Sequence, residues 1–324
     1  MKPLARESEA AFIPPELPCA EALCRAYGVD PAQLERALYA SARDFLARPG
    51  KAFRARMVER CHQLAGGTRA PREALDAVEL LHAGSLIIDD VQDDAEQRRG
   101  APAMHRTLGT PRAINLGNWL YFEALARLDA LPHTLARSAH HCLARCHQGQ
   151  ALDLSLRVGE LRRSDVAALV RFVSALKTGA LLGFAAELGA TTAGASPELV
   201  ANLVTFGERV GVALQMLDDL GSIACEARFD KGREDLRGQR PTWVWAWASE
   251  ALDELSYKQM LKLLERTELE ELRTRLQLAV EPLGRARVDA AIGEARDTLS
   301  SLPVSSQVVA RVRDELNHLA RSYG

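Results

Sequence analysis

Apolar residues recur along most of the chain at spacings of three and four, which is the period of one face of an α-helix. No stretch of useful length alternates with the two-residue period of a strand, and the sequence has no internal repeat or low-complexity linker. The pattern therefore predicts an all-α protein. The expected helices cover residues 31–47, 51–65, 71–94, 111–130, 133–157, 164–190, 197–225, 240–253, 255–266 and 285–320, the last with a break near Pro303.

Capping signals and breaker residues divide these segments. Asp30 followed by Pro31 is typical of a helix N-cap with proline in the first turn. Residues 1–17 contain three prolines and predict an irregular N-terminal arm. We expect residues 1–324 to form a single large helical bundle. Its loops are expected at three short stretches rich in glycine and charge, residues 98–100, 232–235 and 238–241.

Composition narrows the class of protein. The 41 basic and 43 acidic residues of this 324-residue chain leave a formal net charge of -2, which gives no reason to expect nucleic acid or an anionic membrane as a partner. No stretch reads as a signal peptide or as a membrane span of about 18 apolar residues. We therefore expect a cytoplasmic chain without stable membrane insertion, whose six cysteines are reduced.

The first acidic cluster follows the apolar run Leu80–Ile88 and contains Asp89, Asp90 and Asp93. Residues 89 and 93 share one face of a helix, so their carboxylates could hold Mg²⁺, which prefers oxygen ligands and keeps substrate phosphates or waters as the others. Arg98-Arg99-Gly100 follows closely and supplies guanidinium groups suited to diphosphate. An acidic run alone is most simply a solvated helix end, but the apolar approach and the trailing arginines favour a metal site.

A second acidic cluster repeats this arrangement. Leu214–Leu217 leads into Asp218 and Asp219, and Lys231, Arg233, Arg237 and Arg240 follow in stretches expected to be loops. Two opposed carboxylate helices would let bridging Mg²⁺ ions grip a diphosphate from both sides. The pair of clusters is far more specific than either alone.

These motifs resemble those of the trans-isoprenyl diphosphate synthases, or polyprenyl synthetases. The family pattern DDxxDxxxxRRG is complete from Asp89 to Gly100, and the pattern continues over roughly 50–245. Later parts of it are Gly149-Gln150 with Asp153-Leu154, the pair Lys177-Thr178, and Gln215 with Asp218-Asp219. The resemblance implies an isoprenoid-synthase fold with a central active-site cavity, three Mg²⁺ ions and a homodimer.

The resemblance also assigns residues. It implies that Asp89, Asp93 and Asp218 bind Mg²⁺, with Asp90 beside them in the catalytic motif. It implies that Arg98, Lys177, Lys231 and Arg240 hold an allylic diphosphate, next to Thr178 and Gln215. It implies that isopentenyl diphosphate is held by Lys51, Arg54, His82 and Arg99. The segment Gly50–Ala55 keeps only part of the family pattern GGKRxRP, so this second diphosphate site matches less closely than the metal site.

The implied reaction is Mg²⁺-assisted ionisation of the allylic diphosphate, followed by attack of the isopentenyl double bond and loss of a proton to the released diphosphate. Two alternatives remain. The second motif has Ser222 where the family usually has Asp, and Asp218, Ser222 and Glu226 resemble the metal triad of class I terpene cyclases. Residues 218, 222 and 226 would share one helical face. A non-catalytic partner subunit is the third reading.

Product length is set, by the same resemblance, one turn before Asp89. The small residues Gly84 and Ser85 there predict a deep pocket and a medium-length product, with twenty carbons favoured slightly. Trp119, Tyr121 and Phe122 are candidates for the floor of this pocket.

Two other features of the sequence each have a functional and a plainer structural interpretation. A zinc site at Cys142 and Cys146 is less favoured than buried helix cysteines, and a membrane-facing stripe of Trp243, Trp245 and Trp247 is less favoured than helix packing.

Overall fold

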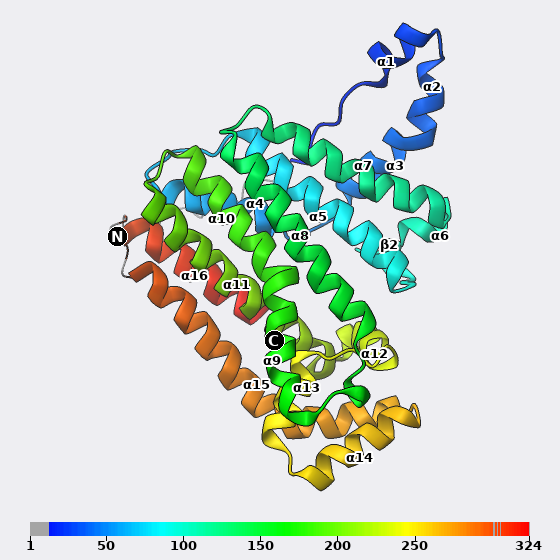
Figure 1. The fold of residues 1–324 in the computed structure, drawn as a ribbon, viewed down its shortest axis with the longest axis vertical. Coiled ribbons are helices and arrows are strands. Elements are labelled where there is room, and N and C mark those ends of the chain that lie inside the picture. Colours follow the sequence, from blue (N-terminus) through cyan, green and yellow to red (C-terminus); the bar gives the residue numbers. More distant parts are fainter. Residues whose placement is uncertain (1–12, 301, 303, 305, 324) are drawn as a thin grey trace, which may run out of the picture. The chain divides into compact units, whose positions relative to one another are not determined.

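A computed structural model of the chain describes residues 13–300, 302, 304 and 306–323. It is built of helices, with one two-stranded hairpin among the described residues (Figure 1). The all-α prediction is confirmed. Two compact units make up the chain, one from Met1–Arg56 and Leu75–Leu128, the other from Met57–Ala74 and Asp129–Gly324. The single-domain organisation stays a prediction.

The first unit carries the N-terminal helices and the first acidic motif. Its elements, including the two helices that pass into the second unit, are α1 (Ala20–Tyr27), α2 (Pro31–Leu34), η1 (Glu35–Tyr39), α3 (Ala40–Ala47), α4 (Phe53–Leu64), α5 (Arg72–Gln92), β1 (Gln97–Arg98), β2 (Ala101–Pro102), α6 (Met104–Leu108) and α7 (Thr110–Leu128).

The second unit carries the second acidic motif. Its further elements are α8 (Thr134–Ser155), η2 (Val158–Glu160), α9 (Arg163–Ser174), η3 (Ala175–Gly179), α10 (Ala180–Thr192), α11 (Pro197–Ala224), η4 (Glu226–Arg228), α12 (Phe229–Arg237), α13 (Trp243–Ala251), α14 (Glu254–Glu265), α15 (Leu269–Ser300) and α16 (Ser306–Tyr323).

Capping signals in the sequence behave as expected. Asp30 accepts a hydrogen bond from the Ala32 backbone N–H at 3.0 Å, with Pro31 in the first turn. Ser196 caps α11 in the same way at Leu199, 3.3 Å, ahead of Pro197. Each side chain satisfies a backbone donor that has no partner inside its helix.

Four helix assignments need correction. Helices α1 and α6 were not predicted, and residues 229–237 form α12 where a loop was expected. Helix α15 begins at Leu269 instead of 285 and runs through Pro282. The predicted break before α16 is present, since α15 ends at Ser300 and α16 begins at Ser306, but Pro303 itself lies outside the described residues, as do residues 1–12 of the expected arm.

Small residues let helices of the first unit approach closely. A Cβ added to Gly84 of α5 would lie 2.7 Å from the Gly117 carbonyl oxygen of α7 and 3.2 Å from Tyr121. Gly84 therefore serves the packing of α5 against α7, and the deep pocket that its small size suggested stays a prediction. Trp119 packs edge-on against Tyr39 at 5.2 Å and Phe122 is 68% exposed, so of the three candidate floor residues only Tyr121 lies against Gly84.

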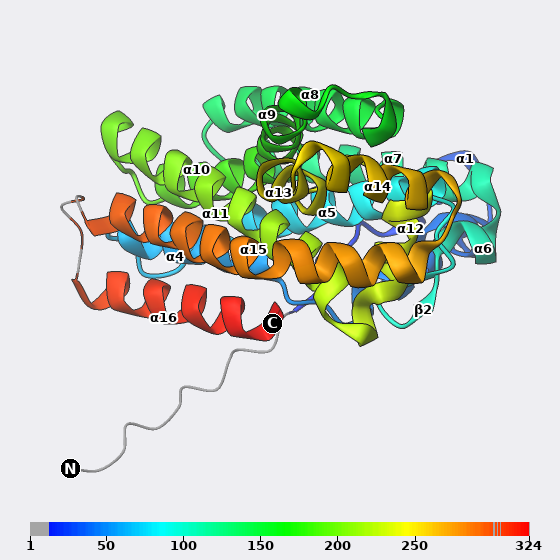
Figure 2. The same ribbon diagram turned by 90° about the horizontal axis from the view of Figure 1, so that it is seen from below.

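The core of the second unit forms around α11. Helices α10, α15 and α16 lie alongside it in both views (Figures 1 and 2). Trp243, Trp245 and Trp247 of α13 are all at least 94% buried, so the plainer reading of that stripe as helix packing holds. Trp247 packs against Gly284, where an added Cβ would lie 2.9 Å from the indole ring.

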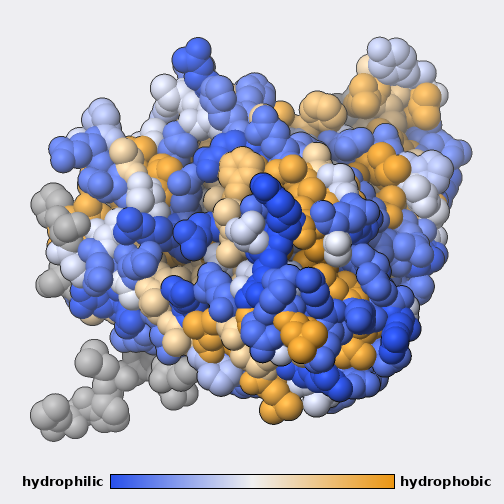
Figure 3. Space-filling view, turned by 60° about the horizontal axis from the view of Figure 1, so that its bottom comes forward, coloured by the Kyte–Doolittle hydropathy of each residue, from blue (hydrophilic) through white to orange (hydrophobic). Residues whose placement is uncertain are grey.

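One helical segment among the described residues, Arg163–Thr192, is long and apolar enough to cross a membrane, although no membrane span was expected from the sequence. More than half of its apolar window, 56%, is buried inside the structure. Leu182 and Leu188 of this segment are fully buried, as in the core helix of a folded domain, and a membrane-spanning helix is not indicated. On the face drawn in Figure 3, apolar residues are interspersed with polar ones.

Candidate active site

The first acidic motif closes helix α5. The Asp93 backbone N–H donates to the Asp89 carbonyl at 2.8 Å, so the two residues lie one helical turn apart and share a face, as predicted. Asp94 then adopts a left-handed φ of +53°, and the Ala95 N–H bonds back to the Asp90 carbonyl at 3.0 Å. This left-handed cap ends the helix directly after the carboxylates.

Helix polarity makes this cluster electrostatically unfavourable without cations. The carbonyl end of a helix carries a partial negative charge, and Asp89, Asp90, Asp93 and Asp94 add four carboxylates to it. Asp218 and Asp219 lie further from the end of their helix, since α11 continues to Ala224, and Asp218 already pairs with Arg228 and Lys231. Bound cations would therefore relieve the repulsion mainly at the end of α5.

Asp90 is the buried member of the first motif. Its side chain is fully buried and accepts a hydrogen bond from Arg98 Nε at 2.7 Å, while Asp89 lies 3.9 Å from the same guanidinium. Burial raises the pKa of Asp90, and Arg98 opposes that rise. The second oxygen of Asp90 is buried without a hydrogen-bond partner. Asp90 thus fixes Arg98, whereas Asp89 is the more accessible carboxylate.

A tight hairpin presents the paired arginines. Strands β1 and β2 pair Arg98 with Ala101, and both turn residues, Arg99 and Gly100, have positive φ, +55° and +76°. Two-residue hairpin turns of this kind favour glycine. Arg48 holds the hairpin by donating to the Pro102 carbonyl at 2.9 Å and is itself paired with Asp44 at 3.1 Å.

A second cationic group gathers in the first unit, near the first acidic motif but built from other residues. Arg54 lies 2.9 Å from His82 Nε2 across α4 and α5. The Arg99 guanidinium lies against Gly50, where an added Cβ would be 3.1 Å away. Gly50 directly precedes Lys51, which is exposed. Burial first, and Arg54 next, lower the pKa of His82 well below its usual value. The neutral ring therefore accepts a hydrogen bond from Arg54.

In the second unit, Asp218 is held by Arg228 and Lys231. Burial acts to raise the pKa of Asp218, but the opposing effect of these two cations is larger. The pKa is therefore lowered overall, and the carboxylate stays charged. Asp219 is buried, accepting from the Trp243 N–H and from Gln215 Nε2, each at 2.8 Å. Asp218 is therefore the carboxylate available to a ligand, and Asp219 ties α11 to α13.

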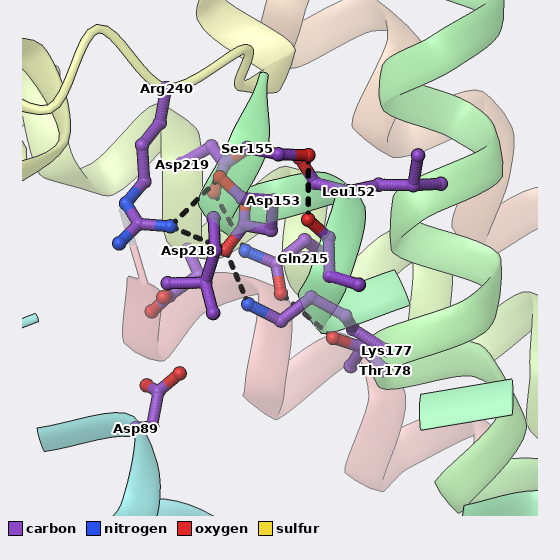
Figure 4. Close-up of polar contacts among 12 residues, drawn as sticks. Asp89, Leu152, Asp153, Ser155, Lys177, Thr178, Gln215, Asp218, Asp219 and Arg240 are labelled. Atoms are coloured by element: carbon purple, nitrogen blue, oxygen red, sulfur yellow. Dashed lines mark hydrogen bonds and ion pairs between the residues drawn. The ribbon is translucent and has the colours of Figure 1, made fainter. Parts of the chain in front are cut away.

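Lys177 and Arg240 converge on one carboxylate, Asp153 (Figure 4). Lys177 Nζ lies 2.6 Å and Arg240 Nη1 3.0 Å from Asp153 Oδ2. Thr178 extends the network by donating to Gln215 at 2.8 Å. No role was predicted for Asp153, although its place in the motif that begins with Gly149-Gln150 was a signal for one.

Lys177 and Thr178 lie in η3, a turn of π-helix between α9 and α10. Helix α8 supports this turn, because the thiols of Cys142 and Cys146 lie 3.5 and 3.6 Å from the carbonyls of Ala180 and Lys177. A Cβ on Gly149 would be 2.9 Å from Lys177 Cγ. The two cysteines therefore pack helices together, which is the plainer of the two readings given to them.

The cyclase-like triad does not share one helical face. Ser222 is buried and donates to the Asp219 carbonyl at 2.6 Å. Helix α11 ends at Ala224, Cys225 is extended, and the Glu226 side chain is 85% exposed and paired with Arg273. The expectation that the helix continues through residue 226 is wrong. Whether Ser222 and Glu226 bind metal stays a prediction.

The remaining predicted residues are also located. Lys231 lies on helix α12 and not in a loop, because Phe229, Gly232 and Leu236 pack one face of that helix inward. Arg240 does lie in a loop, between α12 and α13.

The donors present suit Mg²⁺. Within the described residues, no three Asp, Glu, His or Cys side chains are arranged to hold a metal ion. Mg²⁺, however, is commonly bound by one or two carboxylates with substrate phosphates and waters. Aspartate oxygens on two helices, including a buried Asp90 oxygen without a partner, fit that ion.

An all-α fold with paired aspartates on two helices, each pair accompanied by fixed cations, is the architecture of proteins that grip diphosphates through divalent metal ions. The model of the family described as polyprenyl synthetase matches residues 35–279. The chain belongs to this family, as the sequence motifs predicted.

Individual relatives agree with the family. A geranylgeranyl pyrophosphate synthase from Geoglobus acetivorans is 32% identical over 217 residues, covering 63% of this chain and 66% of that protein. A heptaprenyl diphosphate synthase from Staphylococcus aureus shares the fold with a TM-score of 0.78 at 19% identity, covering 95% of this chain and 99% of that one. A polyprenyl synthase from Caulobacter crescentus, solved with calcium and isoprenyl diphosphate, has a TM-score of 0.76 at 20% identity, covering 96% and 98%.

The alignments to curated relatives are partial. The first four span between 45% and 66% of those proteins' length.

Proposed function

We propose that this protein is a prenyltransferase that joins an allylic diphosphate to isopentenyl diphosphate. The observation that carries this proposal is the Arg54, His82 and Arg99 group in the first unit, which includes none of the aspartates proposed to hold metal. Elongation requires a second diphosphate site, and a terpene cyclase does not. The cyclase reading also loses its geometric support at Glu226, which lies beyond the end of α11.

The proposed roles follow from the side chains. Asp89, Asp93 and Asp218 would hold Mg²⁺, on which this family depends. The bound ions would neutralise charge on the departing diphosphate. Lys177 and Arg240, aligned by Asp153, would bind diphosphate oxygens as the C–O bond breaks. Attack by the isopentenyl double bond then forms the new C–C bond, and the released diphosphate takes the proton, so no side-chain base is required.

Three finer points belong to the same proposal. Three Mg²⁺ ions, a homodimer and a cytoplasmic location stay predictions drawn from the family. A twenty-carbon product is favoured by curated relatives named geranylgeranyl pyrophosphate synthase. The fold alone does not set this length, because a heptaprenyl diphosphate synthase shares it.

The test is incubation of the purified protein with Mg²⁺, isopentenyl diphosphate and, separately, allylic diphosphates of five, ten and fifteen carbons. The expected product is an elongated diphosphate, identified by mass spectrometry, with twenty carbons predominant. A hydrocarbon product formed without isopentenyl diphosphate would establish the cyclase alternative. A lack of any product with all three substrates would favour a non-catalytic subunit.

A further inference from the structure

Glu79 is a buried carboxylate inside a cationic neighbourhood. It is 7% exposed and lies on α5, one turn before His82. Arg54, Arg99 and Arg56 are all close enough to act on its pKa, which burial raises and these cations lower. A negative charge would oppose the binding of a diphosphate to the same arginines. Glu79 therefore calls for a role other than contact with that ligand.

The contact that Glu79 makes is with the backbone of α4. Its Oε1 accepts a hydrogen bond from the Ala55 N–H at 3.0 Å. Ala55 is the third residue of α4, where the N–H has no partner within the helix. A Ser, Thr or Asp at the N-cap usually satisfies such a donor. The residue before α4 is Ala52, which lacks an acceptor, so Glu79 supplies one from a neighbouring helix.

This cap fixes the segment that carries the second cationic group. Ala52 has a positive φ of +42°, which is unfavourable for a residue with a Cβ and must be held by its surroundings. Arg54 lies in the same first turn and reaches His82 at 2.9 Å. Helix α5 thus holds the start of α4 at two points, the backbone through Glu79 and the guanidinium through His82.

We propose that Glu79 is a positioning residue for isopentenyl diphosphate: by capping α4 at Ala55, it sets the direction in which Lys51 and Arg54 face the ligand. This inference rests on the proposed function, since it assigns a part within the second diphosphate site. It concerns the acceptor oxygen of Glu79 and not its charge. The neutral amide of Gln keeps that oxygen, whereas Ala removes it.

The experiment compares Glu79→Ala, Glu79→Gln and wild type in steady-state elongation assays with each substrate varied in turn. We expect Glu79→Ala to raise the KM for isopentenyl diphosphate roughly tenfold, the scale of one lost buried hydrogen bond. The KM for the allylic diphosphate should stay within about twofold, and Glu79→Gln should stay near wild type in both, because the acceptor is kept.

Glu59→Ala is the matched control. Glu59 also lies on α4 and accepts a backbone hydrogen bond, from Ala70 at 3.0 Å, but the bond ties down a loop that carries no candidate site residue. We expect it to lower the melting temperature about as much as Glu79→Ala while leaving both KM values unchanged. If Glu79→Ala does not fold, Glu79→Asp replaces it, because the shorter side chain withdraws the acceptor by one methylene. We then expect a smaller rise in the KM for isopentenyl diphosphate.

Two outcomes would overturn the positioning role while leaving the prenyltransferase assignment intact. One is an equal rise of both KM values in Glu79→Ala. The other is a Glu79→Gln enzyme as impaired as Glu79→Ala, which would assign the effect to charge. Wild-type protein that forms no elongated product would instead overturn the proposed function itself.

Discussion

At the scale of single residues, His82 illustrates how a neighbour sets a charge state. Its ring is buried, accepts from Arg54 and is surrounded by cations; burial first, and the cations next, hold its pKa well below the usual 6.5. As pH falls below that value, the unfolded imidazole binds a proton while the folded one stays neutral. Stability therefore falls as pH decreases from the unfolded pKa toward the folded one.

This linkage gives a pH prediction. In urea denaturation between pH 7 and pH 5, the free energy of unfolding should fall with decreasing pH less steeply for His82→Gln than for wild type. The two slopes should differ by up to about 1.4 kcal/mol per pH unit. Gln stays neutral throughout and keeps an acceptor for Arg54. His141→Gln, an exposed histidine on α8, is the control and should leave the slope unchanged. Identical slopes for wild type and His82→Gln would contradict the depressed pKa.

Individual site residues were predictable to different degrees. Motif spacing found Asp89, Lys177 and Asp218, because it records residue types at fixed separations. The motif placed Asp89 and not Asp90 among the metal ligands, but it could not show that Asp90 is buried against Arg98, because only packing does that. No role was predicted for Asp153, because its partners, Lys177 and Arg240, are 24 and 87 positions away.

At the scale of helices, the contact between α5 and α7 depends on the absence of a side chain at Gly84. Gly84→Ala would place a Cβ 2.7 Å from the Gly117 carbonyl, and backbone cannot yield as a flexible side chain does. We expect a loss of about 1–3 kcal/mol in the free energy of unfolding, measured by chemical denaturation.

A glycine in open space provides the control. Gly293 lies within α15, and an added Cβ there would meet nothing within 4 Å. Gly293→Ala should stabilise the protein by about 0.5–1 kcal/mol, because alanine favours helix. Gly84→Ala that is equally stabilising would show that α5 and α7 do not approach so closely. For the same reason, Gly84→Phe would disturb packing, and Ser85→Phe is the cleaner test of product length.

The helices were largely predictable from periodicity, and two of the exceptions involve a glycine. Gly232 was expected in a loop and the last helix was expected to begin after Gly284, yet both glycines occur inside helices, α12 and α15. Each glycine makes room for a neighbour, the Ser222 carbonyl in one case and the Trp247 ring in the other. Sequence alone does not distinguish a glycine that ends a helix from one that lets helices touch.

At the scale of the whole molecule, the predicted metal ligands belong to two units, Asp89 to the first and Asp218 to the second. The proposed Mg²⁺ site needs both aspartates, so neither alone should suffice. Mg²⁺ with pyrophosphate should raise the melting temperature of wild type, by the equivalent of roughly 2.7 kcal/mol at a hundredfold excess over Kd, and chelation should reverse the rise. Asp89→Asn and Asp218→Asn should each remove most of it.

Asp94→Asn is the control for this experiment. Asp94 belongs to the same acidic run but is 80% exposed, and Asn tolerates its left-handed φ of +53°. It should keep the full stabilisation. Retention of the full rise in either Asp89→Asn or Asp218→Asn would mean that one unit binds the ions without the other.

The hairpin turn at Arg99 and Gly100 limits how this enzyme could be re-engineered. Because the backbone at residue 99 is left-handed, only residues that tolerate a positive φ can replace Arg99, whatever their chemistry. Asn or Gly could occupy the position without strain, whereas Val or Ile would distort the tip and displace Arg98 along with it. Libraries that aim to alter diphosphate preference should therefore vary Lys51 and leave the tip of the hairpin unchanged.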